Sequence, residues 1–320
     1  SAVNKIWLVL GFTILFVGLS FLIFSAIRGE ETGKGARGGK LSAIKKILLN
    51  FMQMVSLAAG LPLRWTPAIQ TMFQTMDTIS SAGTTLLIPD CELSQMKSAD
   101  AFYLKQIVYT CAIPIVVMGS IISWSLLYFV CARRWKLKLE NIKHRMILTM
   151  TLLLFLCYPL LVKLCLSMFK CATIGGIPYL VADLQDACFV DRHLQYVMLL
   201  SVPQLIILMC LPILVFLLLR VNKKHLENPN FRLRYGLLYR GYVKGREWWE
   251  VTIALRKVVA VVIGTFGPML GTPDVQVGCA LFLGLLSIVL HLIGQPFGSP
   301  NGDSKRLHFM ELYSLVVIWC

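Results

Sequence analysis

The sequence predicts an all-α integral membrane protein, a polytopic bundle of about eight transmembrane helices. The 320-residue chain is 57% hydrophobic and only 15% charged, whereas about a quarter of the residues in a soluble domain are charged. The hydrophobic residues come in blocks of about 20, the length that an α-helix needs to cross roughly 30 Å of hydrocarbon. Positive charge gathers in every second connection between these blocks. We predict spans at Ile6–Ile27, Ile47–Leu63, Ile107–Ala132, Met146–Phe169, Tyr196–Leu219, Trp248–Phe266, Val275–Gly294, and a last span that starts near Phe309.

The net charge of +15 is unevenly distributed. The connections after the first, third, fifth and seventh spans hold 22 Lys or Arg, whereas the other connections and the N-terminal flank hold six. This is the positive-inside pattern, so we expect the basic connections in the cytoplasm and the N-terminus outside. Contact with anionic lipid headgroups accounts for such a basic face. We therefore expect the lipid bilayer as a partner and no nucleic acid.

The sequence begins at Ser1 and ends at Cys320, inside the last predicted span. We expect residues 1–320 to be a single transmembrane domain, the membrane portion of a longer chain whose extracellular region lies on the N-terminal side. That extracellular region is then a partner, together with other membrane subunits or extracellular filament proteins.

A short helix is predicted in the outer connection after the second span, in the stretch "TPAIQTMFQTMDTISSAG". Thr66 is a suitable N-cap, Pro67 suits the first helical position, and Gly83 is a plausible end. Apolar residues recur at intervals of three and four, so they share one face. We expect this helix to lie in the outer interface, either as a structural lid or at the mouth of a pore or ligand site.

Two cysteines bracket the outer connection between the fourth and fifth spans, Cys171 and Cys188. In an oxidising compartment they are expected to pair, unless the distance or orientation forbids it. A third outer cysteine, Cys91, is either free or bonded to the missing region. No zinc-ligand spacing and no HExxH or GxSxG motif occurs in the chain, so we expect no metal, no cofactor and no enzymatic activity.

The sixth predicted span carries charge inside its apolar run. It opens on Trp248 and Trp249, which suit the headgroup region as interface anchors, and it contains Arg256 and Lys257. Arg256 lies seven residues beyond Trp249 and is therefore roughly 10 Å deeper. Either the long side chains extend back to the interface, or they pair with an acid inside the membrane.

Two acids are candidate partners in an intramembrane charge pair. Glu250 lies on the same helix two turns from Lys257, too far for direct contact. Glu311, near the cytoplasmic start of the last span, is the better candidate. Two opposite charges on different helices would offset each other's desolvation and fix the helix register. Such a pair is either structural or the bistable element of a gate.

Few other polar residues lie in the spans. Gln204 follows Pro203 in the fifth span, where a small polar pocket at mid-membrane is conceivable. His291 lies near the inner end of the seventh span, either as a hydrogen-bonded contact between helices or as a ligand residue. We keep Gln204 and His291 as candidate polar-pocket residues.

Several segments resemble the transient-receptor-potential-like membrane domain of large algal, oomycete and protist surface proteins and, more distantly, of fungal members. "FRLRYGLLYRGYVKGREWWEVTIALRKVV" resembles that family's basic loop and following span, and "KILLNFMQMVSLAAGLPLRW" its second span. "CATIGGIPYLVADLQDACFVDRH" is similar to its outer loop, and "GQPFGSPNGDSKRLHFMELYSL" to its entry into the last span. The likeness runs from Lys45 to Leu315, with one departure: His308 stands where an asparagine is expected close before the final acid.

The resemblance implies a polytopic fold with a large extracellular region on its N-terminal side, and it implies channel activity only by likeness. We therefore expect a channel-like or sensory protein of the cell surface, in the plasma or ciliary membrane. One alternative is a multi-helix anchor of a large extracellular or ciliary glycoprotein, docked beside a separate channel. A second is a heptahelical-type receptor, which the basic segment Arg220–Arg246 would suit.

Overall fold

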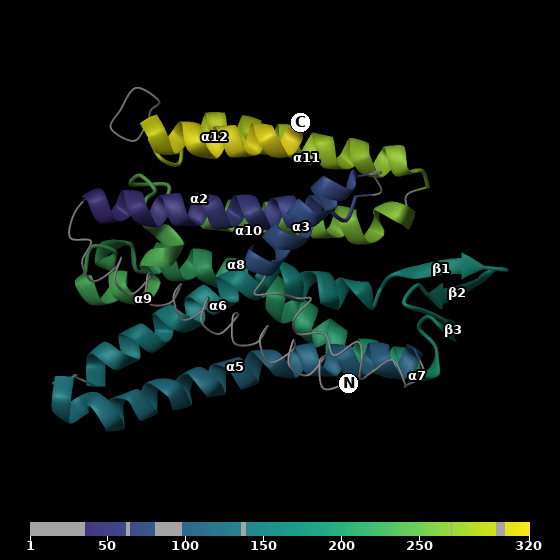
Figure 1. Ribbon diagram of the computed structural model, residues 1–320, viewed down its shortest axis with the longest axis horizontal. Coiled ribbons are helices and arrows are strands. Elements are labelled where there is room, and N and C mark those ends of the chain that lie inside the picture. The colour runs from purple at the N-terminus through teal and green to yellow at the C-terminus, as the bar shows by residue number, and fades with distance from the viewer. Residues whose placement is uncertain (1–35, 62–64, 81–97, 136–138, 270, 299–304) are drawn as a thin grey trace.

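The computed structural model describes residues 36–61, 65–80, 98–135, 139–269, 271–298 and 305–320. The protein is mostly helical, and its helices run along the long axis of the molecule (Figure 1). Among the described residues, five segments are long and apolar enough to cross a membrane. They are Lys40–Ala58, Ile142–Ser167, Asp191–Val221, Trp249–Met269 and Pro273–Gly294.

The number of eight spans stays a prediction. The first predicted span, Ile6–Ile27, lies outside the described residues. The third falls within the 38-residue helix α5 (Ser98–Trp135), whose side chains are described only in part. The last corresponds to α12 (Lys305–Trp319), which continues to the penultimate residue of the chain.

Helix α10 (Trp249–Phe266) lies at the centre of the bundle and packs mainly against five other helices. Its partners are α2 (Ala36–Ala58), α6 (Leu139–Ser167), α8 (Val202–Val221), α9 (Pro229–Tyr239) and α11 (Pro273–Gly294). The largest apolar cluster of the core joins α6 to α8 and α10 through buried side chains that include Val162, Leu208 and Val261. Close packing of these side chains holds α10 in place.

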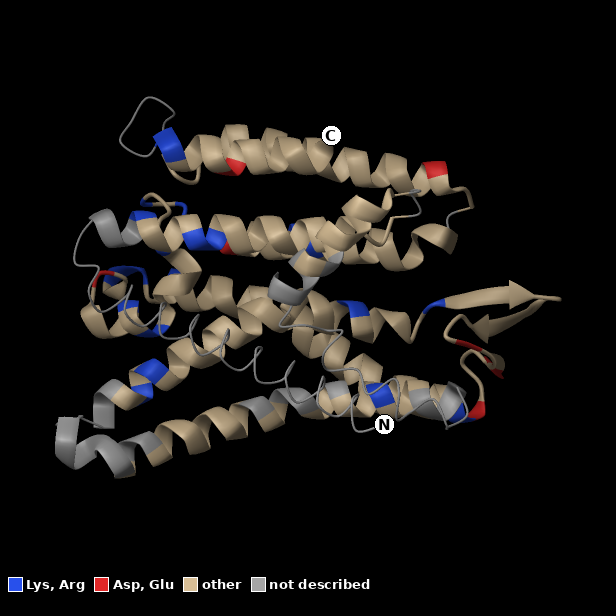
Figure 2. Cartoon of the chain, in the orientation of Figure 1, with Lys and Arg blue, Asp and Glu red and all other residues tan. Residues whose placement is uncertain are grey.

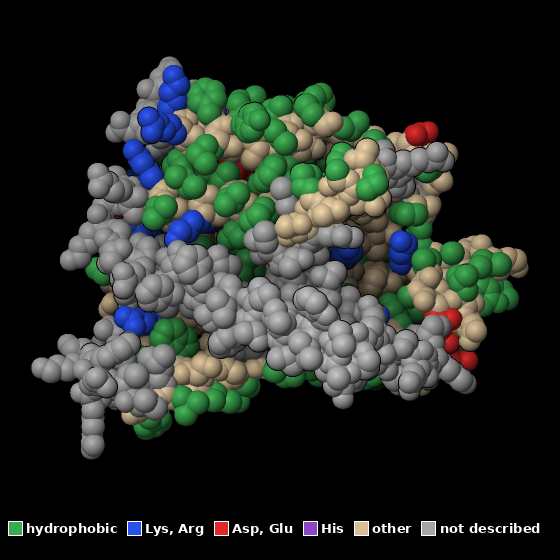
Figure 3. Space-filling model, in the orientation of Figure 1, with side chains coloured by type: hydrophobic (Ala, Val, Ile, Leu, Met, Phe, Trp, Pro, Cys, Tyr) green, Lys and Arg blue, Asp and Glu red, His purple; other side chains and the backbone are tan. Residues whose placement is uncertain are grey.

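Many large apolar side chains face outward. Figure 3 shows hydrophobic side chains over much of the visible helical surface. Phe129 of α5 is 79% exposed, Leu199 is 77% exposed and Ile293 of α11 is 73% exposed. Exposure to water costs about 25 cal/mol for each Å² of apolar surface, whereas exposure to lipid carries no such cost. This surface and the five long apolar helices are those of an integral membrane protein.

The connection between α6 and α8 contains a small sheet that the sequence analysis did not predict. β1 (Cys171–Ile174), β2 (Ile177–Leu180) and β3 (Asp183–Ala187) form an antiparallel sheet in the order β1-β2-β3. Gly175 and Gly176, both with positive φ, make the turn between the first two strands, as two-residue hairpins require. The all-α prediction is therefore corrected to a helical bundle with one small β-sheet.

The disulfide predicted between Cys171 and Cys188 is present, with Cα atoms 6.3 Å apart. It joins the start of β1 to the residue after β3. Cys188 is buried in a cluster with Tyr103 of α5, Met168 and Leu180. The packing of Cys188 therefore holds the disulfide-bonded sheet against the ends of α5 and α6.

A wide π turn, Val197–Ser201, joins α7 (Asp191–Tyr196) to α8. Pro203 lies at the start of α8. A proline has no backbone N–H and its ring crowds the carbonyl four residues earlier, which here belongs to Leu199 inside the π turn. The extra residue in this turn relieves the crowding.

The predicted short helix is present as α3 (Pro67–Ser80), which packs against α2. Phe73 of α3 is buried, and its ring meets the Trp65 ring edge-on at 5.0 Å. Two other connections hold more helix than expected. The basic segment Arg220–Arg246 contains α9, which packs on α6, and α2 already begins in the glycine-rich stretch before the second predicted span.

Charged residues gather at the two ends of the bundle (Figure 2). Lys and Arg are concentrated at the end that carries α9, whereas acids gather on the sheet and at the start of α7 at the opposite end. The interior of the bundle holds the exceptions, which lie on α2, α10 and α12.

Candidate functional site

Five charged side chains are buried around α10, three cations and two carboxylates. Lys257 is 3% exposed, Glu311 is 2% exposed, and the other three, Lys46, Glu250 and Arg256, are also largely withdrawn from the surface. Removing an ion from water costs several kcal/mol even after relaxation, unless an opposite charge and hydrogen bonds compensate it. The partners of each side chain therefore decide what this cluster can do.

Helix α2 presents polar side chains to α10. Lys46, Asn50 and Gln53 recur at intervals of four and three residues, so they lie on one face of the helix, and all three are buried. The Lys46 Nζ atom lies 3.5 Å from Glu250 Oε2 at the start of α10. The same ammonium lies 4.0 Å from the centre of the Tyr242 ring, within the range of a cation–π contact.

Tyr242, in the connection between α9 and α10, completes the Glu250 site. Its hydroxyl donates a hydrogen bond to Glu250 Oε2 at 2.7 Å. Burial and the neighbouring Glu250 carboxylate raise the pKa of Tyr242 well above its usual value, because both disfavour the phenolate. The phenol therefore keeps its proton and remains a donor to Glu250.

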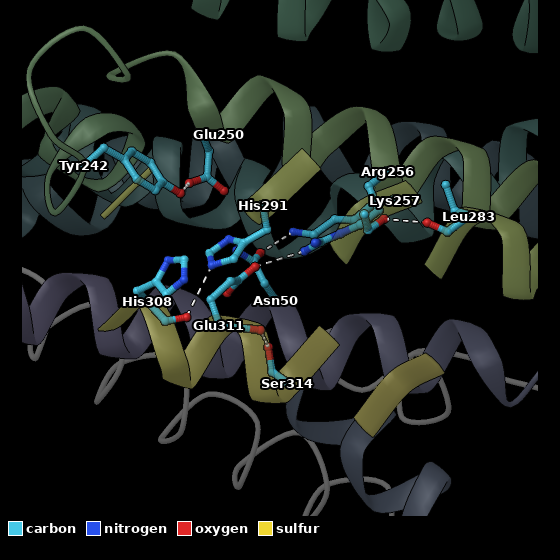
Figure 4. Close-up of polar contacts among 11 residues, drawn as sticks. Asn50, Tyr242, Glu250, Arg256, Lys257, Leu283, His291, His308, Glu311 and Ser314 are labelled. Atoms are coloured by element: carbon cyan, nitrogen blue, oxygen red, sulfur yellow. Dashed lines mark hydrogen bonds and ion pairs between the residues drawn. The ribbon is translucent and has the colours of Figure 1, made fainter. Parts of the chain in front are cut away.

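Lys257 has a neutral partner. Its Nζ atom donates to Asn50 Oδ1 at 2.6 Å (Figure 4). The same atom lies 4.4 Å from the centre of the Phe155 ring. No carboxylate among the described residues lies within 4.0 Å of Lys257 Nζ. The side chain points into the bundle rather than back to the interface, so the alternative of an extended side chain reaching the headgroups is wrong for Lys257.

Arg256 and Glu311 form an ion pair, the second of the two alternatives that the sequence left open for Arg256. Arg256 Nη2 lies 3.4 Å from Glu311 Oε1, which joins α10 to α12. Arg256 Nε has no hydrogen-bond partner among the described residues. The guanidinium is therefore compensated in charge but only partly satisfied in hydrogen bonding.

His291 and His308 stack on each other and join α11 to α12, with ring centres 4.7 Å apart. His291 Nε2 lies 3.2 Å from the His308 carbonyl oxygen. Because a carbonyl only accepts hydrogen bonds, Nε2 carries the proton. His291 therefore makes a hydrogen-bonded contact between helices, one of the two roles considered for it. Its partner is the backbone carbonyl of His308, the residue that stands where the resembled family has an asparagine.

Gln204 is placed apart from His291. Gln204 Oε1 accepts a hydrogen bond from Thr110 Oγ1 at 3.2 Å, which joins α8 to α5. His291 lies in the contact between α11 and α12. The two residues therefore serve different helix pairs and do not line one polar pocket.

The two tryptophans have different surroundings. Trp249 is buried, and its ring lies so close to Gly294 of α11 that a Cβ atom at that position would overlap it. Its prediction as an interface anchor is wrong, because Trp249 packs inward against α11. Trp248 is half-buried beside the Phe216 ring, and its anchoring role stays a prediction.

Three residues of the cluster were missed by the sequence analysis: Lys46, Asn50 and Tyr242. The spacing of Lys46, Asn50 and Gln53 was the available signal, since it places three polar side chains on one face of an otherwise apolar helix. Within the described part of the chain, no group of three His, Cys, Asp or Glu side chains is arranged to hold a metal ion.

Comparison with known proteins gives one partial similarity. A segment of 113 residues is 29% identical to "Cysteine repeat modular protein A" of Toxoplasma gondii. The matched segment is 34% of this chain and only 4% of that protein. No family model matches the chain, and no solved structure matches it.

Proposed function

We propose that this chain is the membrane domain of a larger surface protein of the transient-receptor-potential-like type, and that it works as a channel-like or sensory unit. The observation that carries the proposal is the buried charge cluster, which links α10 to α2 through Lys46–Glu250 and to α12 through Arg256–Glu311. Buried ion pairs give little net stability compared with apolar side chains. Such pairs favour one arrangement of the helices over others. A gate requires helix arrangements that are distinct from each other in this way.

We propose that the end carrying α9 faces the cytoplasm and that the sheet and the N-terminus face outside. Two independent features support this orientation. Lys and Arg gather at the end with α9, as the positive-inside rule expects. The disulfide Cys171–Cys188 lies at the other end, and disulfides persist in oxidising compartments. The plasma or ciliary membrane remains our proposal for the location.

A second function, a multi-helix anchor, is favoured by the cavities beside α10. A cavity of about 180 Å³ lies between α6, α8, α9 and α10, and another of about 150 Å³ adjoins α2, α11 and α12. Both are lined mainly by apolar side chains. An ion path requires polar groups from several helices to converge along it, whereas most of each of these two linings is apolar.

Ion-flux recording separates the two functions. The full-length protein with its extracellular region is reconstituted in liposomes and tested under voltage, membrane tension and calcium. We expect flux from the wild type and, for Glu311→Gln, a change of about fivefold or more in the response, because a coupling of 1–3 kcal/mol corresponds to about 5- to 150-fold. Circular dichroism verifies that the variant keeps its helices.

The matched control is Glu227→Gln. Glu227 also pairs with a cation, Lys244, but both side chains are more than four-fifths exposed, so its removal is expected to leave the flux unchanged. Absence of flux from the wild type under all three stimuli would contradict the channel proposal and leave the anchor.

A further inference from the structure

The cavity between α6, α8, α9 and α10 differs from an ordinary packing defect because it contains two ionisable side chains. Glu250 and Lys257 both line it from α10, two helical turns apart, with Val251 and Ala254 between them on the same face. Apolar or aromatic side chains make up most of the remaining wall. They include Leu154, Phe155 and Tyr158 of α6, Leu211, Pro212 and Val215 of α8, and Leu238 of α9.

The two carboxylates of the buried cluster are already engaged, and one cation is left over. Glu250 accepts from Tyr242 and pairs with Lys46, and Glu311 pairs with Arg256. Among the residues that the structure describes, Lys257 Nζ contacts the neutral Asn50 amide and the Phe155 ring. An ammonium has three N–H donors, so Lys257 retains donor capacity beyond its hydrogen bond to Asn50.

The wall of the cavity and the Lys257 ammonium together indicate the chemical class of the ligand. The apolar wall suits a hydrocarbon chain, and the ammonium suits a carboxylate through a charge-assisted hydrogen bond. Lys257 lies eight residues from the first residue of α10, which is roughly 12 Å along the helix axis. A compact carboxylate on a single chain can reach that depth, whereas a phospholipid headgroup stays at the interface. The Glu250 carboxylate does not prevent the binding of an anion at Lys257, because it lies two turns away and Lys46 offsets its charge.

We propose that this cavity binds the carboxyl end of a long-chain carboxylic acid from the bilayer, with its carboxylate at Lys257 Nζ and the first part of its hydrocarbon chain along α6 and α8. The site is distinct from the Arg256–Glu311 pair, which faces α12 on another side of α10.

The test uses the full chain in nanodiscs of neutral phospholipid and a photoreactive analogue of oleic acid, with the labelled peptides identified by mass spectrometry. We expect saturable labelling of α6 and α8 that oleic acid competes and that methyl oleate does not, because the ester has no charge for Lys257. Lys257→Met is expected to lower the labelling about tenfold or more, because the carboxylate then has no buried cation with which to pair. Lys257→Arg, which keeps the charge, is expected to retain most of it.

Lys163→Met is the matched control, because Lys163 lies on α6 with an exposed side chain. It should label like the wild type. Equal competition by methyl oleate, competition by phosphatidic acid as effective as that by oleic acid, or undiminished labelling of a folded Lys257→Met protein would overturn the proposal. The comparison of acid with ester uses the wild type alone, so it decides the matter even if Lys257→Met fails to fold. The readout is binding and is independent of ion flux.

Discussion

Glu311→Leu is expected to destabilise the bundle by about 3–5 kcal/mol, because it leaves the Arg256 guanidinium buried without its carboxylate. Arg256→Leu is expected to be costly for the converse reason, since Glu311 is only 2% exposed. The double variant Arg256→Leu with Glu311→Leu should be less destabilised than the sum of the two, because two apolar side chains in contact need no compensation. Unfolding in mixed detergent micelles, followed by circular dichroism, measures all three free energies.

The control cycle uses Lys244 and Glu227, an exposed pair at 3.0 Å. Exposed ion pairs contribute about 0–1 kcal/mol, so these variants are expected to change the free energy of unfolding little. If the Arg256 and Glu311 variants instead behave additively, the two side chains do not interact. The pair would then be excluded as the link between α10 and α12.

Loss of the disulfide gives the second large effect. Cys171→Ser together with Cys188→Ser is expected to lower the stability by about 2–5 kcal/mol, since the bond closes a loop with a sequence separation of 17 residues. Cys188 also packs against Tyr103 and Met168, so the loss should reach the ends of α5 and α6. Thermal unfolding with and without a reductant measures it.

The double serine variant should be insensitive to the reductant, whereas the wild type should lose stability on reduction. Cys111→Ser is the control, because Cys111 is an exposed free cysteine. Its unfolding temperature should match that of the wild type. Free thiols at Cys171 and Cys188 in the mature protein, detected by mass spectrometry, would contradict the disulfide.

The long helices were predictable because lipid selects for apolar blocks of fixed length. The predicted spans Trp248–Phe266 and Val275–Gly294 lie within two residues of α10 and α11. The sheet was not predicted, because its strands are only four or five residues long and carry no strict alternation. The Gly175–Gly176 turn was its strongest local signal.

The candidate site was predictable only in part. Glu311 emerged as the partner of Arg256 because few acids lie in or near the spans. Lys46 and Asn50 did not, because which face of α2 meets α10 depends on helix rotation, which tertiary packing decides. Trp249 was misplaced for a related reason: hydropathy does not distinguish a side chain in contact with lipid from one packed against Gly294.

The membrane arrangement is tested most directly by labelling introduced cysteines on intact cells with an impermeant maleimide. Thr173 is exposed on β1, and Lys244 is exposed in the connection between α9 and α10. Each is replaced by cysteine in a separate variant, Thr173→Cys or Lys244→Cys. The parent chain gives the background from the native cysteines. We expect Thr173→Cys to react from outside and Lys244→Cys to react only after the membrane is permeabilised. Reaction of both positions from the same side would contradict a bundle that crosses the membrane between its basic end and its disulfide-bonded sheet.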